Sequence, residues 1–460
     1  ASTSRTSSLA TRNSPGSSAS DMKQQLLDKA RARRTRPANT QSNDEDIFAH
    51  KSAEPLQISD DFVRFDRQPG YQQLSMMQQA GAAFGVPEPF FRVHEGCAGA
   101  TTRIEGRELV NFASYNYLGY SGDPRVVQAA SDAAAHYGTS VSASRVVSGE
   151  RPIHGELERA IAKAYAVEDA VAFVSGHATN VSTLGYLLGP KDLILHDEYI
   201  HNSSLVGAQL SGAKRMSFSH NDPDALEALL TQHRHQFERV LIVIEGLYSM
   251  DGDIPDLPRF IALKQRHQAW LMVDEAHSFG VMGETGLGLR EHFAIDPTDV
   301  DIWMGTMSKT LSGCGGYIAG NTALVETLRY FAPGFLYSVG MPAQVAAPSL
   351  KVLELMPQEP ERVAKLQEIS RYFLEQAQAR GMDTGHSIGS AVVPIIVGSS
   401  PLAAHLSNAL LEQDINVQPI LYPAVPEKSA RLRFFLSCEH TQAHIDETLD
   451  VLEKLLAKGM

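Results

Sequence analysis

A lysine between hydroxyl side chains is the first residue here whose surroundings suggest chemistry. Lys309 follows Thr306 and Ser308 in a turn between the apolar run 300–304 and the glycine-rich run 312–316. A desolvated amine has a lowered pKa and can form a Schiff base with an aldehyde, while neighbouring hydroxyl groups can bind an anion. Because surface lysines often stand in similar turns, a second signal is needed before this turn is assigned to a site.

The second signal is a carboxylate at the end of a buried strand. Residues 270–273 are apolar, and Asp274 and His277 follow them. Open α/β sheets bind ligands at the carboxyl ends of their strands. A carboxylate there can hold a pyridinium N–H, the contact that makes pyridoxal 5'-phosphate (PLP) an electron sink, and His277 can reach the ring oxygen. Lysine, aspartate and histidine in this order predict a PLP site.

Three more motifs follow predicted strands. Gly176 and His177 come after the strand 170–174 and open a helix, where N–H groups favour a phosphate. His201 follows another strand and can stack on a planar cofactor, and Ser249 lies beyond the strand 239–244. A glycine turn or a surface histidine would explain each motif alone. Their expected convergence on one crevice indicates a cofactor site.

Composition limits the class of protein. The chain has 460 residues, 43% of them hydrophobic, and 40 basic against 53 acidic residues give a net charge of −13. This balance disfavours a nucleic-acid partner. The three cysteines have no metal-binding spacing and suggest a reducing compartment. No apolar run approaches the ~20 residues of a membrane helix. We therefore expect a cytoplasmic protein with no metal site and no membrane span.

The order of predicted elements indicates an α/β protein. Helix and strand patterns alternate after residue 124, which predicts a mostly parallel sheet, and short strands are expected at 90–93, 101–104 and 107–112. The polar first sixty residues, with a possible basic helix at 22–34, suit a solvated tail or an interdomain linker. The chain begins with Ala, so we expect it to be processed or cut from a longer one. The predicted divisions are a flexible tail or linker (1–60), an N-terminal arm (61–120), a large PLP-binding domain (121–345) and a small C-terminal domain (346–460).

The motifs together resemble those of the α-oxoamine synthases, which include serine palmitoyltransferase and 8-amino-7-oxononanoate synthase. The longer stretches also resemble PLP modules attached to polyketide synthases. The resemblance rests on motifs in a fixed order: Tyr115-Asn116-Tyr117-Leu118-Gly119, Gly138-Thr139, Ser144-Arg145, Ser175-Gly176-His177, Glu245 with Ser249-Met250-Asp251-Gly252, Asp274 with His277, and Thr306 with Lys309. It implies PLP fold type I, aspartate-aminotransferase-like, with a large domain and a smaller C-terminal α/β domain.

The resemblance also implies roles for individual residues. Lys309 would bind PLP covalently and act as the base, Asp274 would pair with the ring nitrogen, and His201 would stack on the ring. A further contact to the ring oxygen would come from His277 and Ser249. The phosphate would be held by Gly176, His177, Thr306 and Ser308, and the substrate by Arg433, Asn116 and Tyr115.

The expected reaction joins an amino acid to an acyl thioester, on an acyl carrier protein or CoA, with loss of CO₂ to give a 2-aminoketone. Transamination and a non-catalytic partner subunit are the alternatives, and retention of Lys309, Asp274 and His277 argues against the second. The family implies a homodimer with its active site at the interface. Val339 and Gly340 stand where many members have hydroxyl residues that reach the neighbouring subunit's phosphate, which puts that contact in doubt.

Overall fold

The computed structural model describes residues 58–83 and 85–458. It divides into two units between Met77 and Gln78, and each is described by itself. The tail predicted for residues 1–60 lies outside the described residues except for 58–60, and so does the basic helix predicted at 22–34. The other predicted domain boundaries stay predictions.

The described part of the first unit is helical. Ser59 caps α3 (Asp60–Val63) by accepting a hydrogen bond from a backbone N–H of the first turn, which would otherwise have no acceptor. The short helix η1 (Phe65–Arg67) follows, and then α4 (Pro69–Ala83) begins with a proline, which its fixed φ angle favours at a helix start.

The second unit is built on a seven-stranded sheet of order β3-β9-β8-β7-β6-β4-β5. Its β9 pairs antiparallel with both neighbours, whereas the other pairs in this sheet are parallel, so the predicted mostly parallel sheet is confirmed. The strands are β3 (Asp169–Phe173), β4 (Leu193–Asp197), β5 (Lys214–Phe218), β6 (Val240–Glu245), β7 (Trp270–Asp274), β8 (Ile302–Thr306) and β9 (Gly316–Gly320).

The central strands are apolar at nearly every position because they face two cores. In β6, Ile242 and Ile244 belong to one apolar cluster, and Leu241 and Val243 belong to the other. Strand side chains alternate between faces, so a sheet covered on both sides needs apolar residues throughout. The first charged residue of β6 is Glu245, at its carboxyl end.

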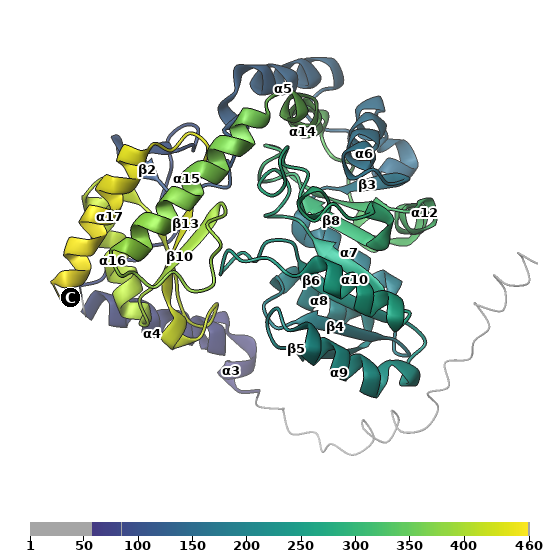
Figure 1. The fold of residues 1–460 in the computed structure, drawn as a ribbon, viewed down its shortest axis with the longest axis horizontal. Coiled ribbons are helices and arrows are strands. Elements are labelled where there is room, and N and C mark those ends of the chain that lie inside the picture. Colours follow the sequence, from purple (N-terminus) through teal and green to yellow (C-terminus); the bar gives the residue numbers. More distant parts are fainter. Residues whose placement is uncertain (1–57, 84, 459–460) are drawn as a thin grey trace, which may run out of the picture. The chain divides into compact units, whose positions relative to one another are not determined.

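Helices cover both faces of this sheet (Figure 1). One core takes side chains from α5, α6, α10 and α14, and the other from α7, α8 and α12. The helices of the large sheet are α5 (Pro124–Tyr137), α6 (Pro152–Tyr165), α7 (Gly176–Leu187), α8 (Asn202–Ser211), α9 (Pro223–His233), α10 (Leu257–Arg266), α11 (Leu289–His292), α12 (Thr322–Phe331), α13 (Pro333–Leu336) and α14 (Ala343–Leu355).

A second, antiparallel sheet has the order β10-β13-β12, and Figure 1 shows α15, α16 and α17 beside it. Its strand β13 (Arg431–Phe435) lies between β10 (Val392–Ile396) and β12 (Gln418–Ile420). The helices are α15 (Pro360–Ala379), α16 (Ser400–Glu412) and α17 (Gln442–Ala457).

The strands predicted at 101–104 and 107–112 are confirmed as β1 (Thr101–Ile104) and β2 (Arg107–Asn111), which pair antiparallel, and β11 (Ile415–Asn416) pairs in parallel with β2. The strand predicted at 90–93 is wrong, since these residues form no strand. Arg92 instead anchors this segment through its guanidinium, which donates to side-chain oxygens of Ser407, Asn408 and Asn416.

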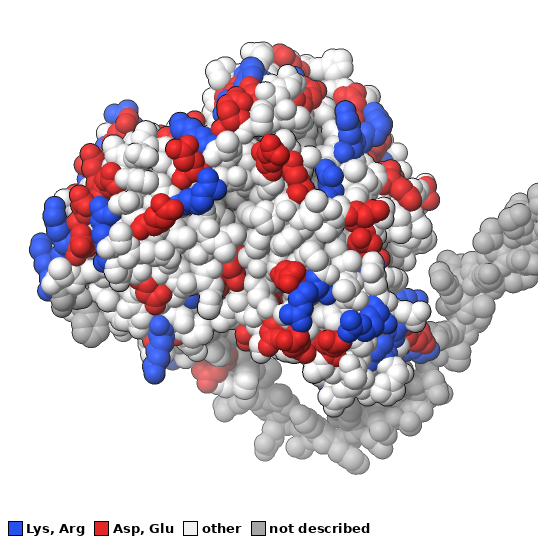
Figure 2. Space-filling view, viewed as in Figure 1, with Lys and Arg blue, Asp and Glu red and all other residues white. Residues whose placement is uncertain are grey.

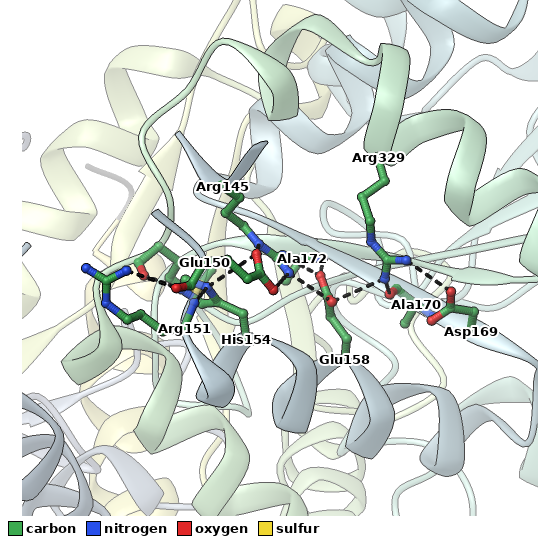
Figure 3. A network of polar contacts seen from close by, with 10 residues as sticks. Arg145, Glu150, Arg151, His154, Glu158, Asp169, Ala170, Ala172 and Arg329 are labelled. Atoms are coloured by element: carbon green, nitrogen blue, oxygen red, sulfur yellow. Dashed lines mark hydrogen bonds and ion pairs between the residues drawn. The ribbon is translucent and has the colours of Figure 1, made fainter. Parts of the chain in front are cut away.

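A buried ion network holds the edge of the large sheet (Figure 3). The carboxylate of Glu158, on α6, accepts hydrogen bonds from Arg145, from Arg329 on α12 and from the backbone N–H of Ala172 on β3. Glu150 also pairs with Arg145, and Asp169 also pairs with Arg329. Side chains from two helices and a strand are therefore joined by opposite charges.

The surface of the described chain is mixed in charge. On the face drawn in Figure 2, Lys and Arg side chains alternate with Asp and Glu around broad uncharged areas. Among the described residues, no helix is both long and apolar enough to cross a membrane.

Candidate active site

The carboxyl ends of several parallel strands and the start of α7 enclose a cavity of about 250 Å³. This edge of the sheet is where open α/β folds place their ligands. The predicted site residues that line the cavity are Gly176, His177, His201, Asp274, His277, Thr306, Ser308 and Lys309.

Asp274 is a buried carboxylate without an ion-pair partner. Its side chain is 4% exposed, and it accepts hydrogen bonds from the Asn180 amide at 3.0 Å and from the Ala276 N–H at 3.0 Å. No Lys, Arg or His of the described chain lies within ion-pair distance of it. Because a buried charge is costly without a partner, this carboxylate suits a cationic group of a ligand.

Lys309 is a buried amine in the wall of the same cavity as Asp274. Burial lowers the pKa of its amine, while the charge of Asp274 opposes this shift. The Nζ atom lies 5.2 Å from the centre of the Tyr115 ring, a cation–π distance. A lysine with a lowered pKa is a better nucleophile and a better base near neutral pH than an exposed one.

His277 is held as a neutral ring. Burial lowers its pKa well below the usual value, and the charges of Lys309 and Arg433 add to this effect. Its Nδ1 atom lies 2.7 Å from the Tyr117 hydroxyl. With Tyr117 donating to Nδ1, the ring carries its proton on Nε2 and can donate it to a ligand oxygen.

The start of α7 can bind an anion. Ser175 caps this helix by accepting a hydrogen bond from the Ala178 N–H, while the N–H groups of Gly176 and His177 have no acceptor among the described residues. A Cβ on residue 176 would lie 3.0 Å from the Thr306 hydroxyl oxygen. Glycine therefore keeps open a close approach to a helix start that favours negative charge.

The two hydroxyl groups beside Lys309 differ in their availability. Thr306 donates its proton to the Gly315 carbonyl at 2.9 Å and accepts a hydrogen bond from the Ser308 N–H at 3.2 Å. Ser308 accepts from the Gly315 N–H at 3.3 Å, so its own proton is available to an anion. The phosphate role predicted for Ser308 is geometrically open, whereas the Thr306 proton is already used.

His201 and Glu245 close another side of the cavity. His201 caps α8 through Nδ1, which accepts from the Ser203 N–H, and burial lowers its pKa. Burial raises the pKa of Glu245 well above its usual range, and the adjacent charge of Asp274 adds to this shift. One oxygen of Glu245 accepts from the Ser249 N–H at 3.3 Å. Glu245 therefore favours its neutral, protonated form beside an ionised carboxylate.

Ser249 and Arg433 do not line the cavity itself but lie next to it. Arg433, on β13, donates to the Ser249 carbonyl at 3.2 Å and stacks on the Phe435 ring, which in turn stacks on His277. Burial lowers the pKa of Arg433, and its Nε atom is buried without a hydrogen bond in the described chain. No carboxylate among the described residues pairs with this guanidinium, which suits it to an incoming carboxylate.

Tyr115 and Asn116, both predicted to bind substrate, are separated by the structure. Tyr115 is half exposed and faces Lys309. Asn116 lines a different cavity of about 520 Å³, and its amide donates to the Ala98 carbonyl and accepts from the Ser121 N–H. The Asn116 side chain is therefore used in these backbone contacts and does not line the cavity beside Lys309.

Several pocket residues were not assigned a role from the sequence. Asn180 donates hydrogen bonds to both Asp274 and Ser203. Tyr117, which stood in a quoted motif, binds His277. The position of Asn180 could have indicated a role, because it lies one turn after the start of α7, the helix that opens the predicted phosphate site. The remaining unassigned lining residues are Ser175, Ser203, Glu245, Ala276 and Met304.

Close packing explains why residue 340, where many family members were expected to have a hydroxyl residue, is a glycine in this chain. A Cβ there would lie 2.9 Å from a Val141 methyl group and 3.0 Å from the Arg145 Cγ atom. Its N–H donates to the Ala143 carbonyl, and Val339 forms a bridge with Ser144. Packing against the segment 141–145 therefore requires a residue without a side chain at this position.

Comparison with known proteins identifies the family. Residues 107–452 match the family Aminotransferase class I and II. The chain is 41% identical over 352 residues to 8-amino-7-oxononanoate synthase of Symbiobacterium thermophilum, covering 76% of this chain and 89% of that protein. It is 37% identical over 346 residues to 4-hydroxy-2,2'-bipyrrole-5-methanol synthase PigH of a Serratia strain, covering 75% of this chain and 52% of that protein. A solved structure of serine palmitoyltransferase with PLP has a TM-score of 0.80 and 28% identity, covering 84% of this chain and 97% of that one.

Proposed function

The chain belongs to the α-oxoamine synthases, PLP-dependent acyltransferases of the class I and II aminotransferase family, and we propose how its side chains serve their reaction. In that reaction an amino acid condenses with an acyl thioester, CO₂ is lost, and a 2-aminoketone forms. The predicted fold type and cofactor are confirmed by the same comparisons.

The pocket fits PLP. The unpaired carboxylate of Asp274 suits a protonated ring nitrogen, and the N–H groups of Gly176 and His177 suit a phosphate. His277 and Ser249 would contact the ring oxygen, and His201 would cover the ring. Ser308 would donate its free proton to the phosphate.

When bound, PLP withdraws the electron pair that remains after the amino acid's Cα loses its proton. Lys309 would hold the cofactor through its amine and, when that amine is free, would take the Cα proton on Nζ. The lowered pKa of the amine makes it a base near neutral pH. Asp274 supports this step by keeping the ring nitrogen protonated.

Arg433 is the proposed anchor for the substrate carboxylate. Its fork of N–H groups has no carboxylate partner in the described chain, and it lies within electrostatic reach of Lys309 and His277. A guanidinium binds a carboxylate bidentately and thereby orients the bond that must break. Tyr115 would limit the space beside the amine.

The bonds of the overall reaction balance without an oxidant. A C–C bond forms between Cα and the thioester carbonyl carbon, the C–S bond breaks, and the sulfur leaves as a thiolate that takes a proton from the solvent. The Cα–carboxylate bond then breaks to release CO₂, and a proton returns to Cα. The proton that Lys309 removed from Cα supplies this return.

The observation that carries the proposal is that Lys309 and Asp274 in the cavity wall, and Arg433 next to it, have no ion-pair partner among the described residues, in a chain of this family. The test supplies carboxyl-labelled amino acids and acyl thioesters to the purified holoenzyme. Labelled CO₂ in equal amount to an aminoketone of the expected mass supports condensation. An oxo acid that retains the labelled carboxyl group would instead identify transamination.

We propose an acyl carrier protein as the thioester donor, in preference to CoA. Its support is that this chain matches only 52% of the relative PigH, so the same unit occurs within a longer protein. A carrier reaches the crevice with a phosphopantetheine arm and needs no pocket for a nucleotide. The test compares kcat/KM for one acyl group on each donor, and equal or better use of the CoA thioester would overturn the preference.

We also propose a homodimer. Large apolar side chains are exposed on segments linked by the Ser144–Val339 bridge, among them Val147 and Tyr337, which are 79% and 82% exposed. Exposed apolar area of this kind is typical of an interface. Light scattering after size-exclusion chromatography should give twice the chain mass, and the monomer mass at micromolar concentration would contradict the proposal.

A further inference from the structure

His220 lies between two carboxylates next to the candidate active site. Its Nδ1 atom is 3.0 Å from Asp197, and its Nε2 atom is 2.8 Å from Asp253. The side chain of His220 is 10% exposed, and those of the two aspartates are 0% and 10% exposed. Since both ring nitrogens face carboxylate oxygens, both carry protons, and the ring is an imidazolium.

Two tyrosine rings pack against this imidazole, and a further carboxylate binds the His220 backbone. Tyr199 lies over it with the ring centres 4.6 Å apart, Tyr248 meets it edge-on at 4.5 Å, and Glu198 accepts from the His220 backbone N–H. Burial opposes the charged form, but hydrogen bonds and charges from Asp197 and Asp253 outweigh burial and raise the pKa of His220 to about 10. The ring therefore stays charged through the physiological pH range.

The two aspartates belong to the two segments that carry predicted cofactor contacts. Asp197 ends β4, and its carboxylate also accepts from the Tyr199 N–H, which fixes the turn that leads to His201. Asp253 ends the loop that contains Ser249, and its carbonyl accepts from the Tyr248 N–H. One side chain thus joins the turn before His201 to the loop around Ser249.

The neighbouring Asn221 strengthens this connection. Its backbone N–H donates to Asp197 at 2.8 Å, and its amide donates to Asp253 at 2.7 Å. Asn221 has a φ of 51°, a left-handed conformation that asparagine tolerates better than most residues. The pair His220-Asn221 therefore binds both carboxylates through four separate N–H groups, counting both ring nitrogens.

We propose that His220 is a positioning residue, an imidazolium clamp that holds the His201 turn and the Ser249 loop at the spacing the bound cofactor requires. It acts through these segments and does not itself touch the cavity. The proposal rests on the proposed function for its kinetic consequence, but the effect on cofactor geometry needs no substrate.

The principal test replaces the imidazolium by a neutral amide in His220→Gln, with His235→Gln as the control. His235 is exposed and lies in the short helix at residues 234–236. We expect the circular dichroism of the bound cofactor to change in His220→Gln, kcat to fall roughly ten- to a hundredfold, and KM for the thioester to stay within about twofold. The control should match the wild type in all three.

The pH dependence of stability gives an independent readout. A folded pKa of about 10, above the unfolded value of about 6.5, makes the stabilisation complete below pH 6.5. It then declines as pH rises and is lost above pH 10. The Tm difference between wild type and His220→Gln should therefore shrink between pH 6.5 and 10, and a constant difference would overturn the charged clamp.

A second variant covers the case in which His220→Gln does not fold. Asp253→Asn keeps the pair with Asp197 and should change the cofactor dichroism in the same direction with a smaller dependence on pH. Unchanged dichroism and unchanged kcat in a folded variant, even with a lower Tm, would show a merely structural residue and overturn the proposal. If the wild type binds PLP but forms no aminoketone, the proposed function fails while dichroism and stability still decide the role of His220.

Discussion

In the network of Figure 3, the guanidinium groups of Arg145 and Arg329 pair with carboxylates, whereas Lys309, Asp274 and Arg433 have no opposite charge within ion-pair distance among the described residues. Arg145 shows the first pattern. Burial opposes its charged form, but Glu150 and Glu158 outweigh burial and raise its pKa. In Arg433 burial prevails, and its pKa is lowered.

The difference indicates what each cluster is for. Removing one partner from a buried pair leaves an uncompensated charge and destabilises a protein, so the network around Glu158 serves the fold. A buried charge with no partner already carries that cost in the free protein. Groups of this kind are typical of sites where a ligand supplies the missing charge.

The largest expected effect comes from Lys309→Ala. Loss of the amine removes both the covalent bond to the cofactor and the base, so turnover should fall by at least roughly 10²–10⁴-fold. Borohydride reduction of the wild type followed by peptide mapping should find the pyridoxyl group on Lys309. A label on another lysine would refute the assignment. Lys351→Ala, at a partly exposed lysine that pairs with Glu354, serves as the control.

In the ion network around Glu158, the substitution Glu158→Gln should destabilise the fold. The neutral amide leaves Arg145 and Arg329 without their shared charge, so the free energy of unfolding should drop by about 3–5 kcal/mol. Glu150→Gln is the matched control, because its carboxylate is half exposed and should contribute under about 1 kcal/mol. Equal losses in denaturant titrations of the two variants would contradict the comparison.

Glu275 is a buried carboxylate whose pKa is raised, so it tests the effect of burial on stability without an ion pair. It is fully buried, accepts from the Leu289 N–H, and burial raises its pKa to about 7. Since the folded state holds the proton more tightly than the unfolded state, wild-type stability should fall as pH rises from about 4.5 to 7. Glu275→Gln should remove this decline and be the more stable protein above pH 7, by on the order of 1–3 kcal/mol. Parallel pH profiles of Tm for the two proteins would refute the explanation.

The smallest expected effect concerns the hydrogen bond between two uncharged side chains, Tyr117 and His277. Tyr117→Phe removes the hydrogen bond to His277 and should lower kcat/KM by roughly two- to tenfold, in line with about 0.5–1.5 kcal/mol for one such bond. Tyr330→Phe, at an exposed position, is the control. A loss as large as that of Lys309→Ala would show that Tyr117 has a direct catalytic role.

The sequence predicts those features that depend on strand order and strand ends. Asp274 directly follows the apolar run 270–273, Lys309 stands five residues after the apolar run 300–304, and parallel strands bring such ends to one edge. The antiparallel β9 begins at Gly316, the last residue of the glycine-rich run 312–316, which on sequence is typical of a loop. The charged strand β5 also lacked an apolar signal because it lies at the sheet edge.

The parts that sequence did not predict depend on side-chain partners. Asn116 has the motif of a substrate contact, but its amide is bound by the backbone at Ala98 and Ser121. The Thr306 proton is taken by Gly315, and Asn180 reaches Asp274 from a different element. Such pairings join residues far apart in the chain, so spacing alone does not reveal them.

The most direct measurement compares the free energies of unfolding of Arg433→Met and Arg145→Met, each determined by denaturant titration without substrate. The account predicts a loss of about 3–5 kcal/mol for Arg145→Met. For Arg433→Met it predicts no loss, or a gain, together with a KM for the amino acid at least roughly tenfold higher. If Arg433→Met destabilises the protein as much as Arg145→Met and leaves KM unchanged, the unpaired charges of the pocket are not kept for ligands and the account fails.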